Sequence, residues 1–142
     1  MREWQSQAHV KWYCRYHVVI EPKYRRKSMF GVIRRDIGEI LKELCCRFEV
    51  DLVEGHVMPD HVHMCLGIPP KYSVSHTIGK LKGKSTILLH QRYGRKRNFI
   101  GLKFWSRGYC VSTVGLDEAV FRNYIRTQEE REKREDQKDL DY

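Results

Sequence analysis

Apolar and polar residues alternate along the first part of the chain. Over residues 9–20, every second position from Val10 to Ile20 is apolar or aromatic. The positions between them carry basic and aromatic side chains, namely Lys11, Tyr13, Arg15 and His17. Because successive side chains of a strand point to opposite faces, the pattern predicts a strand with one apolar face and one basic-aromatic face.

Two later segments instead have apolar residues at intervals of three and four, which is typical of amphipathic helices. In the first, over residues 31–48, the apolar positions are Val32, Ile33, Ile37, Ile40, Leu41, Leu44 and Phe48. In the second, over residues 74–92, they are Ile78, Leu81, Ile87 and Leu88. Ser73 precedes this second segment, and its hydroxyl is suited to cap the first turn of a helix.

Shorter extended segments fill the rest of the chain. Residues 50–57 and a segment ending at Ile68 are separated by Pro59-Asp60, which predicts an antiparallel hairpin with a tight turn. A fourth strand is predicted over residues 102–114, with an interruption near Ser106-Arg107-Gly108.

A last helix is predicted after Asp117 and Glu118, because acidic residues stabilise a helix N-terminus. The order is then β-α-β-β-α-β-α. A βαββαβ core with antiparallel pairing is the ferredoxin-like or RNA-recognition-motif-like fold of the α+β class, with one helix added at the C-terminus. Such a fold leaves one face of the sheet open, and 142 residues suit a single domain of this kind.

The composition bears on where the protein is located and on the state of its cysteines. No apolar run approaches the ~20 residues of a membrane span, and the first residues lack an apolar signal region, so a cytoplasmic protein is expected. The five cysteines form no Cys-x-x-Cys pair, which argues against a disulfide framework and a thiolate zinc cluster. We expect them to be free and mostly buried thiols.

The chain is strongly basic, with a formal net charge of +9. Residues 129–142 hold 7 acids and 4 bases, which leaves 23 bases and 11 acids, or +12, for residues 1–128. A body this basic favours a polyanionic partner, most simply nucleic acid. Charge alone does not distinguish DNA, RNA and an anionic membrane.

Two histidines lie two positions apart within the segment Pro59-Asp60-His61-Val62-His63. On a strand both imidazoles project from one face, while Val62 and its apolar neighbours Met64 and Leu66 project from the other. Two imidazoles on a rigid strand can form half of a metal site, and a site for phosphoryl transfer needs a third protein ligand. Solvent-facing strand histidines without a role are the alternative.

The last predicted helix offers that ligand. Tyr124 and Gln128 are four residues apart and therefore share a helix face. The amide oxygen of Gln128 is a hard ligand suited to Mg²⁺ or Mn²⁺. Tyr124 would stand one turn away as a nucleophile, and its attack on phosphorus would leave a covalent phosphotyrosine. A half-buried core tyrosine is the alternative.

Taken together, these blocks resemble a known family. Pro59-Asp60-His61-Val62-His63 resembles the HUH motif of single-strand DNA endonucleases, in which two histidines flank a large hydrophobic residue. More narrowly, the chain resembles the single-tyrosine (TnpA-type) transposases of small bacterial and archaeal insertion sequences. The resemblance extends over nearly the whole chain, through Leu81-Lys82-Gly83-Lys84-Ser85, Phe104-Trp105-Ser106-Arg107-Gly108-Tyr109, Val111-Ser112-Thr113-Val114-Gly115 and Tyr124-Ile125-Arg126-Thr127-Gln128.

The resemblance implies a transposase domain over residues 1–130, with a tyrosine helix at 121–130 and a charged tail at 131–142. It implies that His61, His63 and Gln128 bind Mg²⁺ or Mn²⁺. It also implies that Tyr124 attacks single-stranded DNA, leaving a 5′-phosphotyrosine and a free 3′-hydroxyl that can later rejoin strands. The family acts as a homodimer on imperfect DNA hairpins at element ends, and the tyrosine helix of one subunit can complete the site of the other.

Several basic side chains are candidate contacts to DNA phosphates, and they lie on the second helix, on the loop after it and on the open sheet face. They are Lys11, Arg15, Lys80, Lys82, Lys84, Arg92, Arg95, Lys96, Arg97 and Arg107. Trp105 is a candidate for stacking on an unpaired base, with a core or dimer role as the alternative.

Three other functions remain open on the sequence. One is a domesticated or non-mobile endonuclease acting on repetitive palindromes, and another is a non-catalytic nucleic-acid binder of RNA-recognition-motif shape. The open sheet face lacks the usual aromatic pair of the latter. The third is a replication initiator or relaxase, which normally carries further segments for which 142 residues leave no room.

Overall fold

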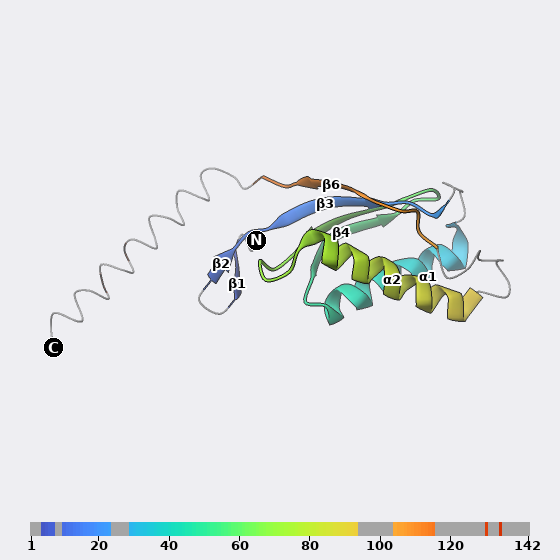
Figure 1. The fold of residues 1–142 in the computed structure, drawn as a ribbon, viewed down its shortest axis with the longest axis horizontal. Helices are drawn as coiled ribbons and strands as arrows, with labels where there is room; N and C mark the ends of the chain where they lie inside the picture. Colours follow the sequence, from blue (N-terminus) through green and yellow to red (C-terminus); the bar gives the residue numbers. More distant parts are fainter. Residues whose placement is uncertain are drawn as a thin grey trace.

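The computed structural model describes residues 4–7, 10–23, 29–93 and 104–115, together with Glu130 and Arg134. The strands are β1 (Gln5–Gln7), β2 (Val10–Trp12), β3 (Arg15–Ile20), β4 (Asp51–Val57), β5 (Val62–Gly67) and β6 (Cys110–Thr113) (Figure 1). The helices are α1 (Gly31–Arg47) and α2 (Val74–Tyr93). The predicted tyrosine helix, with Tyr124 and Gln128, lies outside the described residues.

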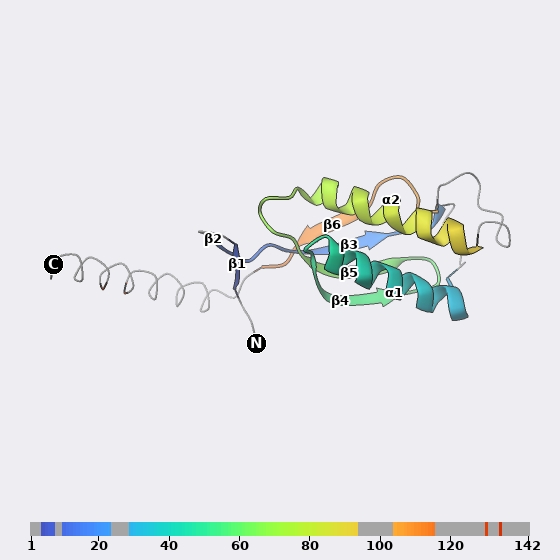
Figure 2. The same cartoon turned by 90° about the horizontal axis from the view of Figure 1, so that it is seen from below.

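Strands β3 to β6 form one sheet in the order β4-β5-β3-β6, and every neighbouring pair is antiparallel. Helices α1 and α2 lie side by side on one face of this sheet (Figures 1 and 2). The other face carries no helix among the residues that the structure describes. This is the βαββαβ arrangement, so the predicted α+β fold class is confirmed.

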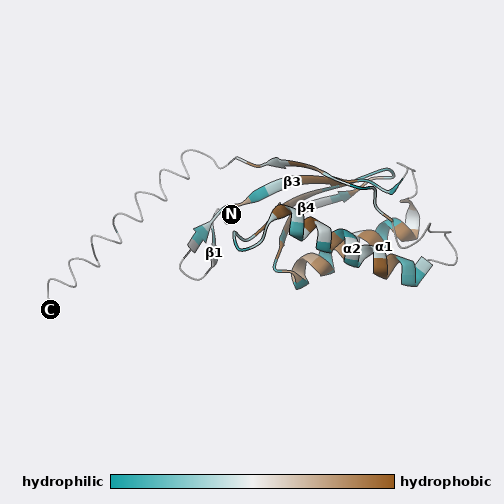
Figure 3. Cartoon of the chain, in the orientation of Figure 1, coloured by the Kyte–Doolittle hydropathy of each residue, from teal (hydrophilic) through white to brown (hydrophobic). Residues whose placement is uncertain are grey.

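The core lies between the helices and the sheet, and apolar and polar residues alternate around both helices (Figure 3). Its fully buried members include Ile33, Ile37 and Leu44 of α1 and Ile78, Leu81 and Leu89 of α2. Each such side chain stabilises the fold by roughly 1.5–3 kcal/mol when it leaves water. Neither described helix is long and apolar enough to cross a membrane.

The predicted helix bounds agree with the structure to within a residue or two, and the predicted cap is present. The Ser73 hydroxyl accepts a hydrogen bond from the backbone N–H of His76 at 3.1 Å. Two predicted core positions are wrong, because Val32 and Ile87 are 66% and 43% exposed. At 100° per residue both lie away from the buried stripe of their helix, despite being apolar.

The prediction of a single first strand over residues 9–20 is wrong. Tyr13 and Cys14 divide it, and β2 pairs with β1 in a separate two-stranded sheet. This small hairpin lies at one end of the main sheet (Figure 1), where Gln5 Nε2 donates to Asp51 Oδ2 at 3.3 Å. Gly67 permits the close approach, since a Cβ there would lie 2.9 Å from Gln5 Oε1.

Strand β4 contains a bulge that decides which side chains reach the open face. Leu52 pairs with Leu66, but Glu54 pairs with Cys65, so Val53 is an extra residue on β4. Even-numbered residues therefore change face at this point. Leu52 packs against the core, whereas Glu54 and His56 lie on the open face.

A second irregularity precedes β6, where the sequence predicts an interruption. Between Val19 and Pro22 the chain advances three residues, while the paired positions Cys110 and Trp105 are five apart. The two extra residues make a bulge over residues 106–109, called here the 106–109 bulge, in which Gly108 has a φ of +87°. Lys82 Nζ fixes it by donating to the carbonyl oxygens of Ser106 and Gly108 at 2.8 and 2.9 Å.

The five cysteines are free thiols, but they are less buried than expected. Cys45 and Cys65 are buried, Cys14 is intermediate, and Cys46 and Cys110 are exposed. Burial, with smaller contributions from Asp51 and Cys46, raises the pKa of the Cys45 thiol to about 12. The neighbours Cys45 and Cys46 therefore differ sharply in reactivity, because the thiolate is the nucleophile.

Iodoacetamide at pH 8 is expected to modify Cys46 and to leave Cys45 intact in the folded protein. Both lie in one tryptic peptide, so mass spectrometry should show one added group on Cys46. After denaturation in guanidinium chloride the same peptide should carry two. Equal modification of both cysteines in the folded protein would contradict the burial of Cys45.

Candidate functional site

His61 and His63 lie at the start of β5, a central strand of the sheet. Val62, Met64 and Leu66 are 1%, 2% and 0% exposed on the helix side. His63 is partly exposed on the opposite face, and His61 precedes the first strand residue by one position. The alternation predicted from the sequence is confirmed, and the buried residues anchor the strand so that the histidines face outward.

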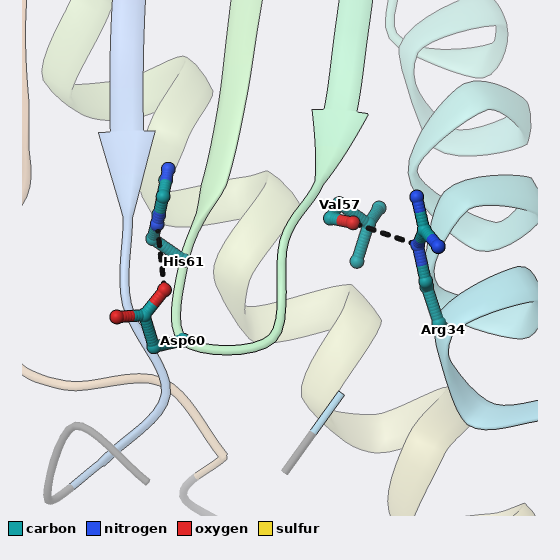
Figure 4. Close-up of polar contacts among 4 residues, drawn as sticks. All are labelled: Arg34, Val57, Asp60 and His61. Carbon is teal, nitrogen blue, oxygen red and sulfur yellow. Dashed lines mark hydrogen bonds and ion pairs between the residues drawn. The ribbon is translucent and has the colours of Figure 1, made fainter. Parts of the chain in front are cut away.

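The turn that carries His61 is held by contacts from three sides. Within it, Met58 N donates to the carbonyl oxygen of His61 at 2.8 Å. From outside, Met29 N donates to the carbonyl oxygen of Pro59 at 3.2 Å. Arg34 of α1 donates from Nε to the carbonyl oxygen of Val57 at 2.8 Å (Figure 4). The hairpin end is thus fixed to α1.

Asp60 contacts the first histidine directly. Its Oδ1 lies 2.9 Å from Nδ1 of His61 (Figure 4). A carboxylate at this position favours a proton on Nδ1 and leaves Nε2 as the lone-pair nitrogen. Asp60 therefore forms part of the turn and also orients His61.

Two further histidines surround His63 on the open face. His56 of β4 pairs directly with His63 across the strands. The ring of His17 on β3 lies 5.3 Å from the ring of His63, measured between centroids. Glu54 contacts His56 at 2.8 Å, and this hydrogen bond, with the nearby charges of His56, His63 and His17, lowers the pKa of Glu54.

The sequence assigns no role to His17 or Glu54. Alternation does put His17 on the basic face of its strand. Its contact with His63 depends on the pairing of β3 with β5, which places His17 opposite Cys65. Glu54 reaches the same face only because of the bulge at Val53.

His61 and His63 supply two of the ligands that a divalent cation would need. Two imidazoles, one of them oriented by a carboxylate, are a common arrangement around catalytic metals. Among the described residues, however, no group of three or more His, Cys, Asp or Glu side chains is placed to hold a metal ion. A complete site would need a further ligand, and Gln128 lies outside the described part of the chain.

The candidate DNA contacts fall into three groups. Arg95, Lys96 and Arg97 lie outside the described residues. Lys11, Lys84 and Arg107 are exposed. The remaining basic side chains already have partners within the protein: Arg15 lies over the Tyr13 ring at 4.8 Å, Lys80 over the Phe48 ring at 4.1 Å, Arg92 3.6 Å from Asp36, and Lys82 on the 106–109 bulge.

Trp105 is a core residue in this fold. It is 5% exposed, and its indole Nε1 donates to the Ser85 hydroxyl at 2.8 Å. Of the two roles left open by the sequence, stacking on a base is contradicted by this burial. The indole is part of the hydrophobic core, between α2 and the segment that leads into β6.

The structure is thus an antiparallel α+β fold in which two histidines face outward at the start of the central strand β5. The chain also matches the family model described as Transposase IS200 like over residues 10–128. It belongs to the IS200-like transposase family.

Two curated relatives have similar sequences. The transposase for insertion sequence element IS200 of Salmonella typhimurium is 43% identical over 143 residues, covering 100% of this chain and 94% of the relative. The ISDra2 transposase TnpA of Deinococcus radiodurans is 29% identical over 119 residues, covering 82% of this chain and 85% of the relative.

Two solved structures share the fold. The crystal structure of a candidate transposase from Deinococcus radiodurans R1 superposes with a TM-score of 0.68 at 28% identity, covering 87% of this chain and 96% of that one. A REP-associated tyrosine transposase bound to a REP hairpin superposes with a TM-score of 0.54 at 12% identity, covering 78% and 61%. The second is similar in fold alone.

Proposed function

We propose that the protein cleaves and rejoins single-stranded DNA at the ends of an insertion sequence through a 5′-phosphotyrosine intermediate. The observation that carries the proposal is the pair His61 and His63, turned outward by the buried Val62 in a chain of the IS200-like family. The basic body supports a DNA substrate.

In this proposal Tyr124 is the nucleophile. Its phenolic oxygen forms a bond to the scissile phosphorus, and the bond from phosphorus to the 3′ oxygen breaks. The tyrosine loses its proton, and the leaving 3′ oxygen takes one up. The phosphodiester energy is kept in the phosphotyrosine, so a 3′-hydroxyl can reverse the step and join strands.

His61, His63 and Gln128 would hold a divalent cation, Mg²⁺ or Mn²⁺. When bound, such an ion supplies positive charge that stabilises the phosphate as negative charge develops. His61 would use Nε2, since Nδ1 lies against Asp60. The neighbouring side chains of His17 and His56 would restrict the orientation of the His63 ring.

The partner is proposed to be a DNA hairpin at the element end. The similar fold of a tyrosine transposase bound to a REP hairpin supports this by analogy. We further propose a homodimer, with the tyrosine helix acting within its own subunit or in the other. Light scattering after size-exclusion chromatography tests the dimer.

The function is tested with labelled single strands from the DNA that flanks the gene. Wild-type protein with Mg²⁺ should form a covalent protein–DNA adduct that survives denaturing electrophoresis. EDTA should prevent the adduct, and added Mn²⁺ should restore it. Failure to form any adduct on flanking strands in either metal would reject the proposal.

Asp60→Asn is expected to weaken Mn²⁺ binding by about 10–100-fold, because the carboxylate orients the His61 ligand. Calorimetric titration of Mn²⁺ measures the effect. Glu54→Gln is the matched control, since it removes a carboxylate that contacts His56 and not His61. Equal losses in the two variants would mean that general negative charge, and not the orientation of His61, is responsible.

A further inference from the structure

A basic pocket lies beside the 106–109 bulge, between α2 and the chain that leads into β6. Its volume is about 540 Å³. Three cationic side chains line it, Lys23, Lys82 and Arg107, together with the hydroxyl-bearing Thr86 and Ser106. None of the described residues that line it is acidic, so its walls carry three positive charges.

Lys82 is the unusual member of this set. Its ammonium group is partly buried and spends two of its three N–H donors on the carbonyl oxygens of Ser106 and Gly108. Burial lowers the pKa of Lys82. Within the described part of the chain no carboxylate pairs with it, so its positive charge adds to those of Lys23 and Arg107 on the pocket wall.

The pocket lies at the same end of the sheet as the histidines. Ile20 pairs with Val62, so Glu21 is level with His61 across β3 and β5. Ser106 N in turn donates to the carbonyl oxygen of Glu21 at 2.8 Å. Two strand spacings of about 4.8 Å therefore separate the backbones of His61 and Ser106, or roughly 10 Å.

The histidines and the pocket lie on opposite sides of the sheet, and the edge of the sheet at β6 lies between them. The histidines lie on the open face, whereas the pocket is lined by α2 on the helix side. The segment before β6 runs from the helix layer to the edge of the sheet (Figures 1 and 2). A strand of DNA leaving the histidines over this edge would meet the pocket.

We infer that the pocket of Lys23, Lys82 and Arg107 binds a backbone phosphate of the substrate strand, on the path that leads away from the histidine site. This inference rests on the proposed function. Because the pocket and the histidines lie on opposite sides of the sheet, the bound phosphate is expected to lie beyond the immediate neighbours of the scissile one. Lys82 holds the bulge in shape through its two hydrogen bonds. Lys23 and Arg107 supply the phosphate contacts, and they can be substituted without removing those hydrogen bonds.

The occupant is a phosphate and not a base. Trp105 lines the pocket but is 5% exposed and bonded to Ser85, so it offers little ring surface for stacking. Cations and hydroxyls remain, and these bind phosphate without reading sequence. The subsite therefore adds affinity and direction to the strand, and leaves sequence choice to other parts of the protein.

The first experiment measures binding of a fluorescent single strand from the element end at several salt concentrations. Lys23→Gln combined with Arg107→Gln should weaken binding about fivefold at 0.1 M salt and reduce the log–log salt slope by about 0.7. Arg47→Gln combined with Lys71→Gln is the control for the loss of two charges, because neither residue lines the pocket and they pair with Glu43 at 3.2 Å and Glu49 at 2.7 Å. Equal effects of the control and the double variant would overturn the inference.

The second experiment locates the phosphate. Strands carrying one neutral methylphosphonate linkage are scanned outward from the phosphate at which the adduct forms. One linkage beyond the immediate neighbours of that phosphate should weaken binding to wild type and leave binding by the Lys23/Arg107 double variant unaffected. The same sensitivity in both proteins would overturn the subsite, while adduct formation by wild type would still support the proposed function.

Discussion

Replacement of Tyr124 by phenylalanine is expected to abolish covalent attachment to DNA and to lower strand cleavage by at least about 1000-fold. The change removes one oxygen atom, the proposed nucleophile, and keeps the ring. In the proposal Tyr124 is the nucleophile, so the loss should persist in Mg²⁺ and in Mn²⁺. Denaturing electrophoresis of labelled DNA measures both adduct and cleaved strand.

DNA binding provides the control for this variant. Tyr124→Phe should bind the strand with nearly wild-type affinity, because the basic surface is unchanged. Tyr109→Phe, which alters an exposed tyrosine beside β6, should form the adduct normally. An adduct of normal yield in Tyr124→Phe would exclude this tyrosine as the nucleophile and point to another residue.

His63→Ala is expected to reduce adduct formation by at least about 100-fold, because a metal ligand contributes several kcal/mol to stabilising the charged phosphate. The fold should persist, since His63 projects away from the core that Val62 and Met64 build. The initial rate of adduct formation at increasing Mn²⁺ measures the effect. Very high Mn²⁺ should restore part of the rate.

His56→Ala is the matched control. It removes an imidazole from the residue that pairs directly with His63 on the same face. Because His56 already contacts Glu54, its loss should change the rate by only a few-fold. If His56→Ala and His63→Ala were equally damaging, the identity of the paired histidines as ligands would have to be reconsidered.

The parts of the fold that depend on local periodicity could be predicted from the sequence. Both helices, the hairpin of β4 and β5 and the outward direction of the histidines follow from spacings within a few residues. The division of the first strand could not be predicted, because it depends on contacts such as that between Gln5 and Asp51. Val32 and Ile87 show that an apolar residue near a stripe is not always part of it.

Site prediction reached the same limit. His61 and His63 are neighbours in sequence, so their shared face is a local property. His17 joins them through the register of β3 against β5, and Trp105 is buried through its contact with Ser85 on α2. Neither relation is encoded in spacing along the chain. The roles of Tyr124 and Gln128 remain predictions, because their geometry lies outside the described residues.

The bulge at Val53 decides where β4 can lose a residue. Deleting Val53 would remove the extra residue and leave Leu52 opposite Leu66 and Glu54 opposite Cys65, so no side chain would change face. Deleting Gly55, with the pairs of Leu52 and His56 kept, would instead place Glu54 opposite Met64 on the helix side of the sheet. Related chains should therefore lose the residue at the bulge more readily than a residue elsewhere in this strand.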